Sequence, residues 1–137
     1  MSNSELLNAL NHALNREVST FLRYMLQGAS IKGAQWEPVR QMYLAEVADE
    51  MGHAQFLAGK IAMLGGTPEL NPDLTPPVAS VEAMLKHDIA EEEQDVQGYT
   101  QLAELADQAG LIDLKIRMEE QAADEAGHAE RMRRLLG

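Results

Sequence analysis

Apolar side chains recur every three or four residues along four stretches of the chain, which is the spacing of a helix that buries one face. The stretches cover about residues 4–32, 37–64, 80–109 and 112–136. None of them alternates apolar and polar residues as a half-buried strand does. Helices of this length would each be about 40 Å long. The pattern therefore predicts an all-α four-helix bundle, with residues 1–137 forming a single domain.

The connection between the second and third predicted helices differs from the other two. Short turns around Gly33 and Gly110 make each flanking pair of helices antiparallel neighbours. Residues 65–77 instead contain four prolines, which exclude a helix there. About 14 extended residues reach about 46 Å, which is the length of the bundle. We therefore expect a long crossover that leaves the second and third helices parallel.

Several positions on the apolar stripes carry polar side chains, although carboxylates are rarely buried without a partner. Six of these residues are Glu17, Glu50, His53, Glu92, Glu125 and His128. Glu17, Glu50 and His53 lie in the first pair of predicted helices. Each has an identical residue 75 positions later in the second pair, at Glu92, Glu125 and His128 respectively. Six of the seven residues 48–54 recur at 123–129. These matches indicate the internal duplication of a helical hairpin.

The turns predict that the six side chains meet. In an antiparallel hairpin, residues equidistant from the turn lie at the same height. The midpoint of the first glutamate pair falls at Gly33, and that of the second pair falls just before Gly110. Duplication then brings four carboxylates and two imidazoles together at mid-bundle. His12 and His87 share the offset but lie about 140° round their helices from the glutamates, so we expect them off this face.

Four carboxylates in an apolar interior repel one another strongly, and two divalent cations would balance them. Glutamate and histidine three residues apart project from one helical face and can bind the same metal. Two glutamates and two Glu-x-x-His motifs form the ligand set of di-iron and di-manganese carboxylate bundles. Solvated surface acids are the simpler alternative, but no lysine or arginine occupies the central positions. The pattern predicts a two-metal centre.

At these residues the sequence resembles the ferritin-like superfamily, and most closely bacterioferritin, over nearly the whole chain. The most specific stretches are 49–54 and 61–68. The resemblance implies two iron ions at the six positions, with manganese or a mixed Mn/Fe pair as alternatives. Glu50 and Glu125 would bridge the metals, and the other two glutamates would be terminal. It also implies oxidation of Fe(II) by O2 or H2O2, a ferroxidase-type reaction that serves iron handling or detoxification.

Four further residues have two interpretations each. Tyr24 and Tyr99 lie two turns after the terminal glutamates, where they can hydrogen-bond a ligand or relay an electron, or simply fill the core. Met51 matches the methionine that ligates haem in the bacterioferritin dimer, but methionine is also a common helix residue, and haem b is not expected. Asp95 matches an extra carboxylate of rubrerythrins, or is a solvated member of an acidic run.

The surroundings of the centre lead to two more expectations. Asp49 and Asp88 are expected to orient the outer histidine nitrogens. Ala45 replaces a histidine that better-studied family members carry on the inner surface of their cage. Bacterioferritin also has a short fifth helix that helps close its 24-subunit shell, whereas this sequence ends about nine residues after His128. We expect a homodimer or a larger homo-oligomer, with the storage cage in doubt.

Composition narrows the functional classes. Eleven basic and 22 acidic residues give a net charge of −11, which argues against nucleic acid and suits cations. The absence of cysteine excludes thiol catalysis, iron–sulfur clusters and cysteine-ligated zinc. No signal peptide is visible and no apolar run reaches the ~20 residues that span a membrane, so we expect a cytoplasmic protein. The alternatives to a ferroxidase are a rubrerythrin-like peroxidase without iron storage, a non-catalytic metal-binding or storage bundle, and a purely structural bundle.

Overall fold

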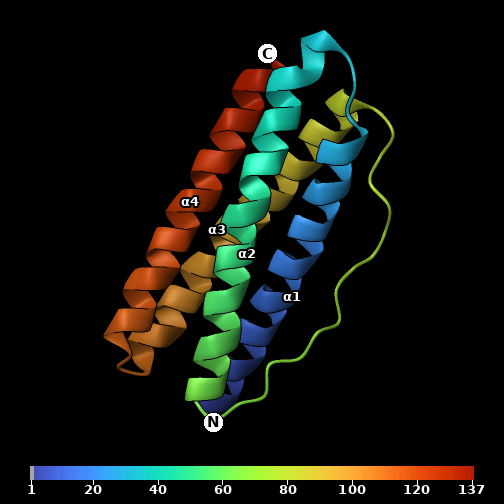
Figure 1. Cartoon of the computed structure of the whole chain (residues 1–137). Coiled ribbons are helices and arrows are strands. Elements are labelled where there is room, and N and C mark those ends of the chain that lie inside the picture. Colours follow the sequence, from blue (N-terminus) through green and yellow to red (C-terminus); the bar gives the residue numbers. More distant parts are fainter. Residues whose placement is uncertain (1) are drawn as a thin grey trace.

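The computed structural model describes residues 2–137, and it confirms the all-α four-helix bundle (Figure 1). No strand occurs within this range. The elements in chain order are α1 (Ser2–Ser30), the short 3-10 helix η1 (Ala34–Trp36), α2 (Glu37–Met63), α3 (Val81–Gln108) and α4 (Ile112–Leu136). Helices α1 and α2 pack as one pair and α3 and α4 as the other, while α1–α3 and α2–α4 contacts join the pairs.

Local chemistry explains the helix boundaries. Gly33 has a φ of 104°, a conformation that favours glycine, and it separates α1 from η1. Pro38 lies in the first turn of α2, where its missing N–H has no helical acceptor to lose. The Ser80 hydroxyl caps α3 by accepting a hydrogen bond from the Ala83 amide at 3.1 Å. Helix α1 ends at Ser30, two residues before the predicted boundary, and the next residue, Ile31, is buried in the core.

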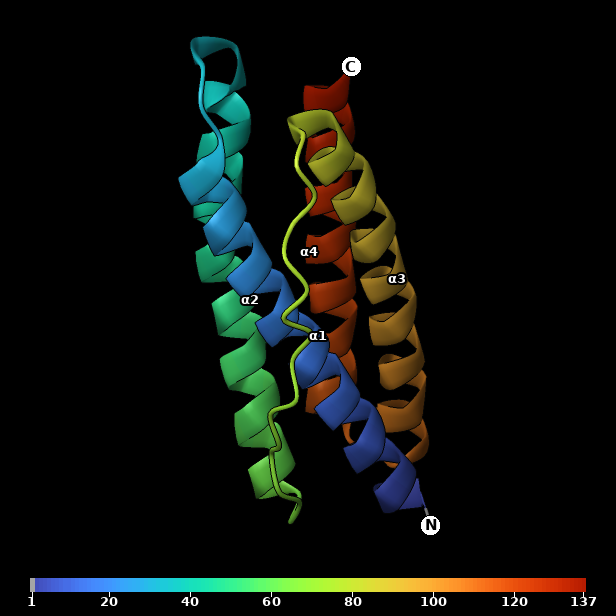
Figure 2. The same ribbon diagram turned by 90° about the vertical axis from the view of Figure 1, so that its right-hand side faces the viewer.

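The crossover between α2 and α3 runs the length of the bundle along α1, as Figures 1 and 2 show from two sides. Helices α2 and α3 consequently run in the same direction, as the proline-rich connection predicted. A ladder of α1 side chains holds this segment. Asn11 accepts from the Glu69 amide at 2.9 Å, Asn15 accepts from the Asn71 amide, and Ser19 accepts from the Asp73 amide at 2.8 Å.

These hydrogen bonds form at successive positions because the spacing of the side chains along α1 matches the spacing of amides along the extended crossover. The α1 residues of the ladder are four apart, which is a rise of about 6 Å along the helix. The crossover amides at 69 and 71 are two residues apart, which is about 6.6 Å in an extended chain. The side-chain amides of Asn11 and Asn15 also donate to the carbonyls of Thr67 and Glu69, at 3.1 and 2.9 Å. The backbone polar groups of this proline-rich strap therefore find partners without a sheet.

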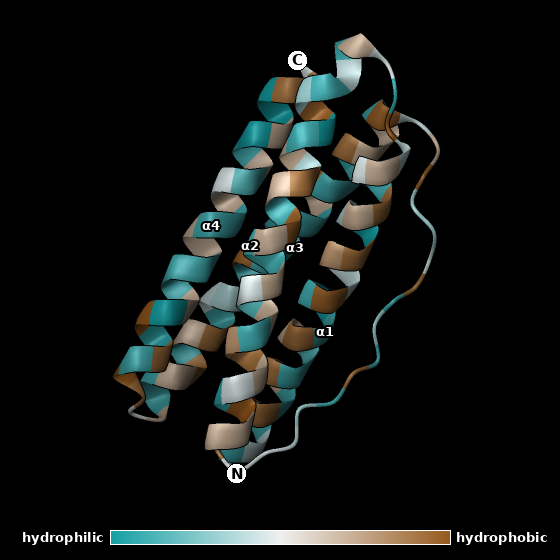
Figure 3. Ribbon diagram, in the orientation of Figure 1, coloured by the Kyte–Doolittle hydropathy of each residue, from teal (hydrophilic) through white to brown (hydrophobic). Residues whose placement is uncertain are grey.

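Two apolar clusters close the two ends of the bundle. One contains Leu10, Leu57 and Leu114, and the other contains Tyr43, Leu85 and Met132. Figure 3 shows mostly hydrophilic residues along the visible face of α4. The polar layer predicted from the sequence lies between the clusters. Within residues 2–137, no helix combines the length and apolar character that crossing a membrane requires.

The ladder makes a testable prediction. Asn15→Ala removes both crossover contacts of that side chain and is expected to lower the free energy of unfolding by about 2 kcal/mol, because each of the two hydrogen bonds is worth about 1 kcal/mol. Urea unfolding followed by circular dichroism measures the change. Asn8→Ala is the matched control, since Asn8 is exposed on the same helix. Equal stability of the two variants would contradict a stabilising role for the ladder.

Candidate metal centre

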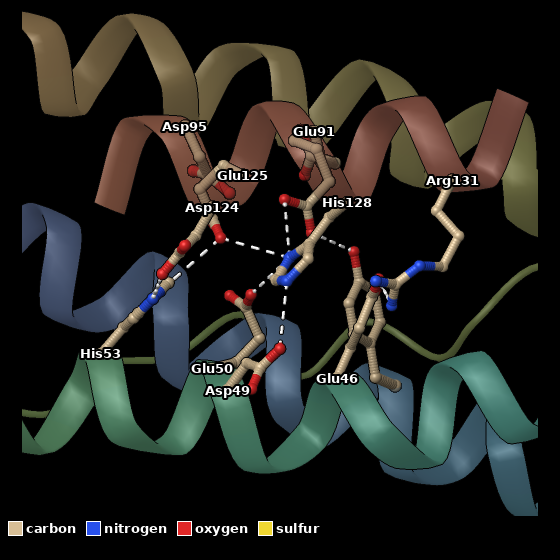
Figure 4. Close-up of polar contacts among 12 residues, drawn as sticks. Glu46, Asp49, Glu50, His53, Glu91, Asp95, Asp124, Glu125, His128 and Arg131 are labelled. Atoms are coloured by element: carbon tan, nitrogen blue, oxygen red, sulfur yellow. Dashed lines mark hydrogen bonds and ion pairs between the residues drawn. The ribbon is translucent and has the colours of Figure 1, made fainter. Parts of the chain in front are cut away.

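All four long helices contribute to one buried polar layer, part of which is drawn in Figure 4. Helices α1 and α3 supply one glutamate each, and α2 and α4 supply one Glu-x-x-His motif each. The residues are Glu17, Glu50, His53, Glu92, Glu125 and His128, none more than 6% exposed. The structure thus brings together the six side chains that were predicted to meet from the 75-residue repeat and from their equal distances to the helical turns.

Their ligand atoms form two overlapping groups, and within each group all atoms lie within 4.8 Å of one another. The first group, called the His53 position below, consists of Glu17, Glu50, His53 and Glu125. The second group, called the His128 position, consists of Glu50, Glu92, Glu125 and His128. The glutamates of the two Glu-x-x-His motifs belong to both groups, so each of them is placed to contact two ions at once.

The two histidines occupy equivalent places in the duplicated layer. His53 Nδ1 is 3.6 Å from an oxygen of Glu17 and 3.6 Å from an oxygen of Glu125. On the other side, His128 Nδ1 is 3.1 Å from an oxygen of Glu50. Each Nδ1 therefore faces the centre and lies beside the motif glutamate of the other hairpin.

The inward-facing atoms have no hydrogen-bond partners in the described chain. They are six carboxylate oxygens and two imidazole nitrogens: Glu17 Oε2, both oxygens of Glu50, His53 Nδ1, Glu92 Oε2, both oxygens of Glu125, and His128 Nδ1. Buried polar atoms without partners are costly, so native proteins rarely retain them without compensation. Hard oxygen and imidazole donors suit iron and manganese. The donor set, its burial and its missing partners fit a pair of divalent cations.

Both tyrosines hydrogen-bond a glutamate of this layer, one of the roles that their spacing predicted. Tyr24 donates its hydroxyl proton to Glu92 Oε1 at 2.6 Å, and Tyr99 donates to Glu17 Oε1 at 2.5 Å. In each glutamate the other oxygen, Oε2, has no hydrogen-bond partner. The tyrosines thus orient the α1 and α3 carboxylates so that one oxygen of each faces the centre.

Aspartates contact the outer histidine nitrogens across the hairpins. Asp49 Oδ2 is 3.3 Å from His128 Nε2, as predicted, and Asp124 Oδ2 is 3.0 Å from His53 Nε2. A carboxylate at this nitrogen orients the ring and keeps Nδ1 directed inward. The sequence interpretation missed Asp124, although its position is 75 residues after Asp49 and the same offset would have identified it.

The expectation that Asp88 orients a histidine of the centre is wrong. Asp88 lies one turn before Glu92 and instead accepts hydrogen bonds from Tyr43 at 2.7 Å and from Arg23 at 3.0 Å. The Tyr43 ring packs against Tyr24, with ring centroids 5.0 Å apart. Asp88 is therefore connected to the centre indirectly, through two tyrosines and the Glu92 carboxylate.

The remaining candidates lie at the margin of the layer or outside it. Asp95 is buried, but its Oδ1 is 2.5 Å from Arg16 Nε, so a cation already faces it. Met51 is 45% exposed on α2 and points away from the centre. The extra-ligand role of Asp95 and the haem role of Met51 stay predictions. His12 and His87 are exposed and lie off the central face, as expected.

Glu46 is a buried acid to which the sequence interpretation gave no role, although its position belongs to the apolar stripe. It lies one turn before Glu50, is fully buried, and has no hydrogen-bond partner at either carboxylate oxygen. Arg131 Nη1 is 3.6 Å from Glu46 Oε1, beyond hydrogen-bond distance. In Figure 4, Glu46 and His53 lie on opposite sides of Glu50 along α2.

Crowding of acids changes the protonation of the layer. Burial first, and then the neighbouring carboxylates, raise the pKa of Glu50 and of Glu125 well above the usual range. Burial also raises the pKa of Glu46 to about 8 and that of Asp95 to about 7. Burial lowers the pKa of His128, but the nearby carboxylates of Glu50 and Glu92 outweigh it and raise the pKa to about 11. Without metal the layer therefore retains protons that bound cations would displace.

Fold and site together define a class of protein, a four-helix bundle with a buried carboxylate–histidine centre. A family model described as a ferritin-like domain matches residues 7–137, and the chain belongs to this family. The match includes all six residues of the layer. No curated protein matches the sequence.

Solved structures give the same assignment. A crystal structure of ferritin-like, diiron-carboxylate proteins from Bacillus anthracis is 31% identical, with a TM-score of 0.95, and the match covers 100% of this chain and 99% of that one. Bacterioferritin from Desulfovibrio desulfuricans is 21% identical, with a TM-score of 0.89 and coverage of 98% and 80%. A dodecameric thioferritin, the bacterioferritin-related protein of Bacteroides fragilis, is 22% identical, with a TM-score of 0.85 and coverage of 98% and 85%. The last two likenesses show the shared fold.

The electrostatics predict an unusual pH dependence. Acids whose folded pKa exceeds their unfolded pKa stabilise the fold below the unfolded value, and this stability is lost as the pH rises through the folded value. Glu46 and Asp95 are acids of this kind. Folding raises the pKa of Glu46 from 4.5 to about 8 and that of Asp95 from 3.8 to about 7. The metal-free protein should therefore lose stability between about pH 5 and pH 8, by up to about 1.4 kcal/mol per pH unit for each group.

Thermal unfolding of the metal-free protein at pH 5, 6.5 and 8 checks this expectation. The Tm should fall at each step. Glu46→Gln removes one of the titrating groups and should make the decline shallower. A Tm that is constant or rises over this range would show that the buried acids ionise without cost.

Proposed function

We propose that this chain binds two iron ions in the carboxylate–histidine layer and oxidises Fe(II) with O2 or H2O2, as an iron-handling protein. The observation that carries the proposal is the set of eight buried, inward-facing donor atoms without hydrogen-bond partners. The protein similar to this chain from Bacillus anthracis is described as a diiron-carboxylate protein, which supports iron as the metal. Manganese is compatible with the same donors.

The side chains have distinct roles in this proposal. Glu50 and Glu125 belong to both donor groups and would bridge the two ions. Glu17 and Glu92 would each bind one ion through Oε2, because a tyrosine holds Oε1. His53 and His128 would bind through Nδ1 and therefore have to be neutral. Four carboxylates and two divalent ions then sum to zero charge, which removes the repulsion inside the layer.

When bound, two Fe(II) ions would supply two electrons and become two Fe(III) ions; with two protons, these electrons convert H2O2 into two waters or O2 into H2O2. The protein holds the ions close together and excludes bulk water with the apolar clusters above and below the layer. Protons displaced from the buried acids and histidines leave as the ions enter. Tyr24 and Tyr99 each hydrogen-bond one terminal ligand, so they are also placed to pass an electron to the centre.

We further propose that the chain forms a homodimer or a larger homo-oligomer. Large apolar side chains are exposed on the two helices of the first hairpin: Met25, Leu26, Leu44 and Met51. Exposed apolar groups of this size favour contact with another surface. The related protein from Bacteroides fragilis is dodecameric.

An anaerobic titration with Fe(II), followed by exposure to air, tests the proposed site. The wild-type chain should bind about two Fe(II) ions and then oxidise them, with H2O2 and O2 compared as oxidants. A much faster reaction with H2O2 would favour the peroxidase alternative. Glu50→Ala should lose binding at both positions, because Glu50 contributes to each group.

The control for this experiment is Glu93→Ala. Glu93 is next to Glu92 in sequence, but it is exposed and pairs with Arg133 on the surface. This variant should bind and oxidise iron like the wild type. If Glu50→Ala also retained two tightly bound ions, the proposed centre would be wrong.

A further inference from the structure

The internal duplication allows each half of the centre to be compared with the other. The six candidate ligands, the two tyrosines and the two outer aspartates all recur 75 residues apart. The polar residues that do not recur therefore mark where the two metal positions differ. Three buried carboxylates have no acidic counterpart: Glu46 corresponds to Gln121, Asp95 to Thr20, and Asp88 to Ala13.

Glu46 and Gln121 differ in charge but are equally buried. Both are buried, with exposed fractions of 0% and 1%, and neither side chain has a hydrogen-bond partner. Glutamine has nearly the shape of a glutamic acid side chain, so this place in the fold accepts a neutral amide. The carboxyl group of Glu46 is therefore not required by packing, and its capacity to carry a negative charge is what distinguishes Glu46 from Gln121.

Glu46 belongs to the His128 side of the centre. The charged groups that act on it include His128, Glu92 and Arg131. His128 and Glu92 are members of the His128 position and of no other donor group. Gln121, the counterpart, lies one turn before Glu125 on α4, which corresponds to the His53 side in the duplicated arrangement.

The other two unmatched carboxylates do not cancel this difference. Asp95 is hydrogen-bonded to Arg16 Nε at 2.5 Å, and Asp88 accepts from Arg23 Nε at 3.0 Å, so each negative charge already has a direct cationic partner. The cation nearest to Glu46 is Arg131, which is 3.6 Å away, makes no hydrogen bond with it, and has a side chain that is 55% exposed. Solvent therefore screens Arg131 far more than a bound divalent cation in the interior would be screened.

We propose that Glu46 makes the two metal positions unequal, so that a divalent cation occupies the His128 position before the His53 position. This inference rests on the two-metal centre proposed above. Four carboxylates are shared between two cations, and Glu46 supplies to one side a further buried carboxylate that has no hydrogen-bonded cation. The attraction between a divalent cation and an additional carboxylate is strong at low effective dielectric, and it raises affinity even where the carboxylate is not a direct ligand.

Binding of Mn(II) to the metal-free full chain tests the order of loading. Electron paramagnetic resonance gives the two stepwise association constants. Anomalous diffraction from crystals of protein with one equivalent of Mn(II) shows which position is filled. The wild type should place the first ion at the His128 position. Glu46→Gln should lower the first association constant by about tenfold or more and distribute a single equivalent over both positions.

Gln121→Glu is the reciprocal variant. It should strengthen binding at the His53 position and reduce the difference between the stepwise constants. Thermal unfolding of the metal-free variants separates charge from packing. Glu46→Gln should unfold at the wild-type temperature or above, because it removes an unpaired buried acid, even though it binds Mn(II) more weakly.

The outcomes are distinguishable. A wild-type chain that binds fewer than two Mn(II) ions would overturn both the proposed centre and this inference. Two bound ions with stepwise constants unchanged in Glu46→Gln would overturn the inference and leave the centre intact. A first ion at the His53 position of the wild type would also overturn the proposed order.

Discussion

Repulsion among carboxylates buried at mid-bundle is the constraint on which the rest of the structure depends. Four glutamates from four helices meet within a few ångströms, and no lysine or arginine lies among the six donor residues. A metal-free bundle tolerates this arrangement only by retaining protons, as the raised pKa values of Glu50 and Glu125 indicate. The apolar clusters at both ends supply the packing that holds the layer together.

The crossover determines which helices can meet. Because α2 and α3 run in the same direction, the second hairpin faces the first about a pseudo-two-fold axis, and each Glu-x-x-His motif faces its own duplicate. The strap that makes this possible contains four prolines and cannot pair in a sheet. Its backbone groups instead bond to Asn11, Asn15 and Ser19, so the topology depends on one polar edge of α1.

The sequence predicted much of the fold and the candidate site, because duplication provides an internal comparison. The helices, the crossover and the six central residues followed from periodicity, proline content and one offset. Asp124 was missed although the offset indicated it. Asp88 was assigned incorrectly because spacing along one helix does not say which neighbouring helix a side chain reaches, and here its partners are Arg23 and Tyr43 rather than a histidine of the centre. The α1 ladder depends on how an extended strap lies against a helix, which a pattern within one element does not contain.

Duplication also constrains how such a centre can become specialised. Two identical halves would bind two cations symmetrically, and neither position would be distinguished from the other. A change inside the donor set would weaken binding, because Glu50 and Glu125 each belong to both positions. A change one turn away leaves all six donors in place and alters only the potential at one position. Glu46 and Gln121 differ at such a place, where both side chains are buried without a hydrogen-bond partner and only Glu46 can carry a negative charge.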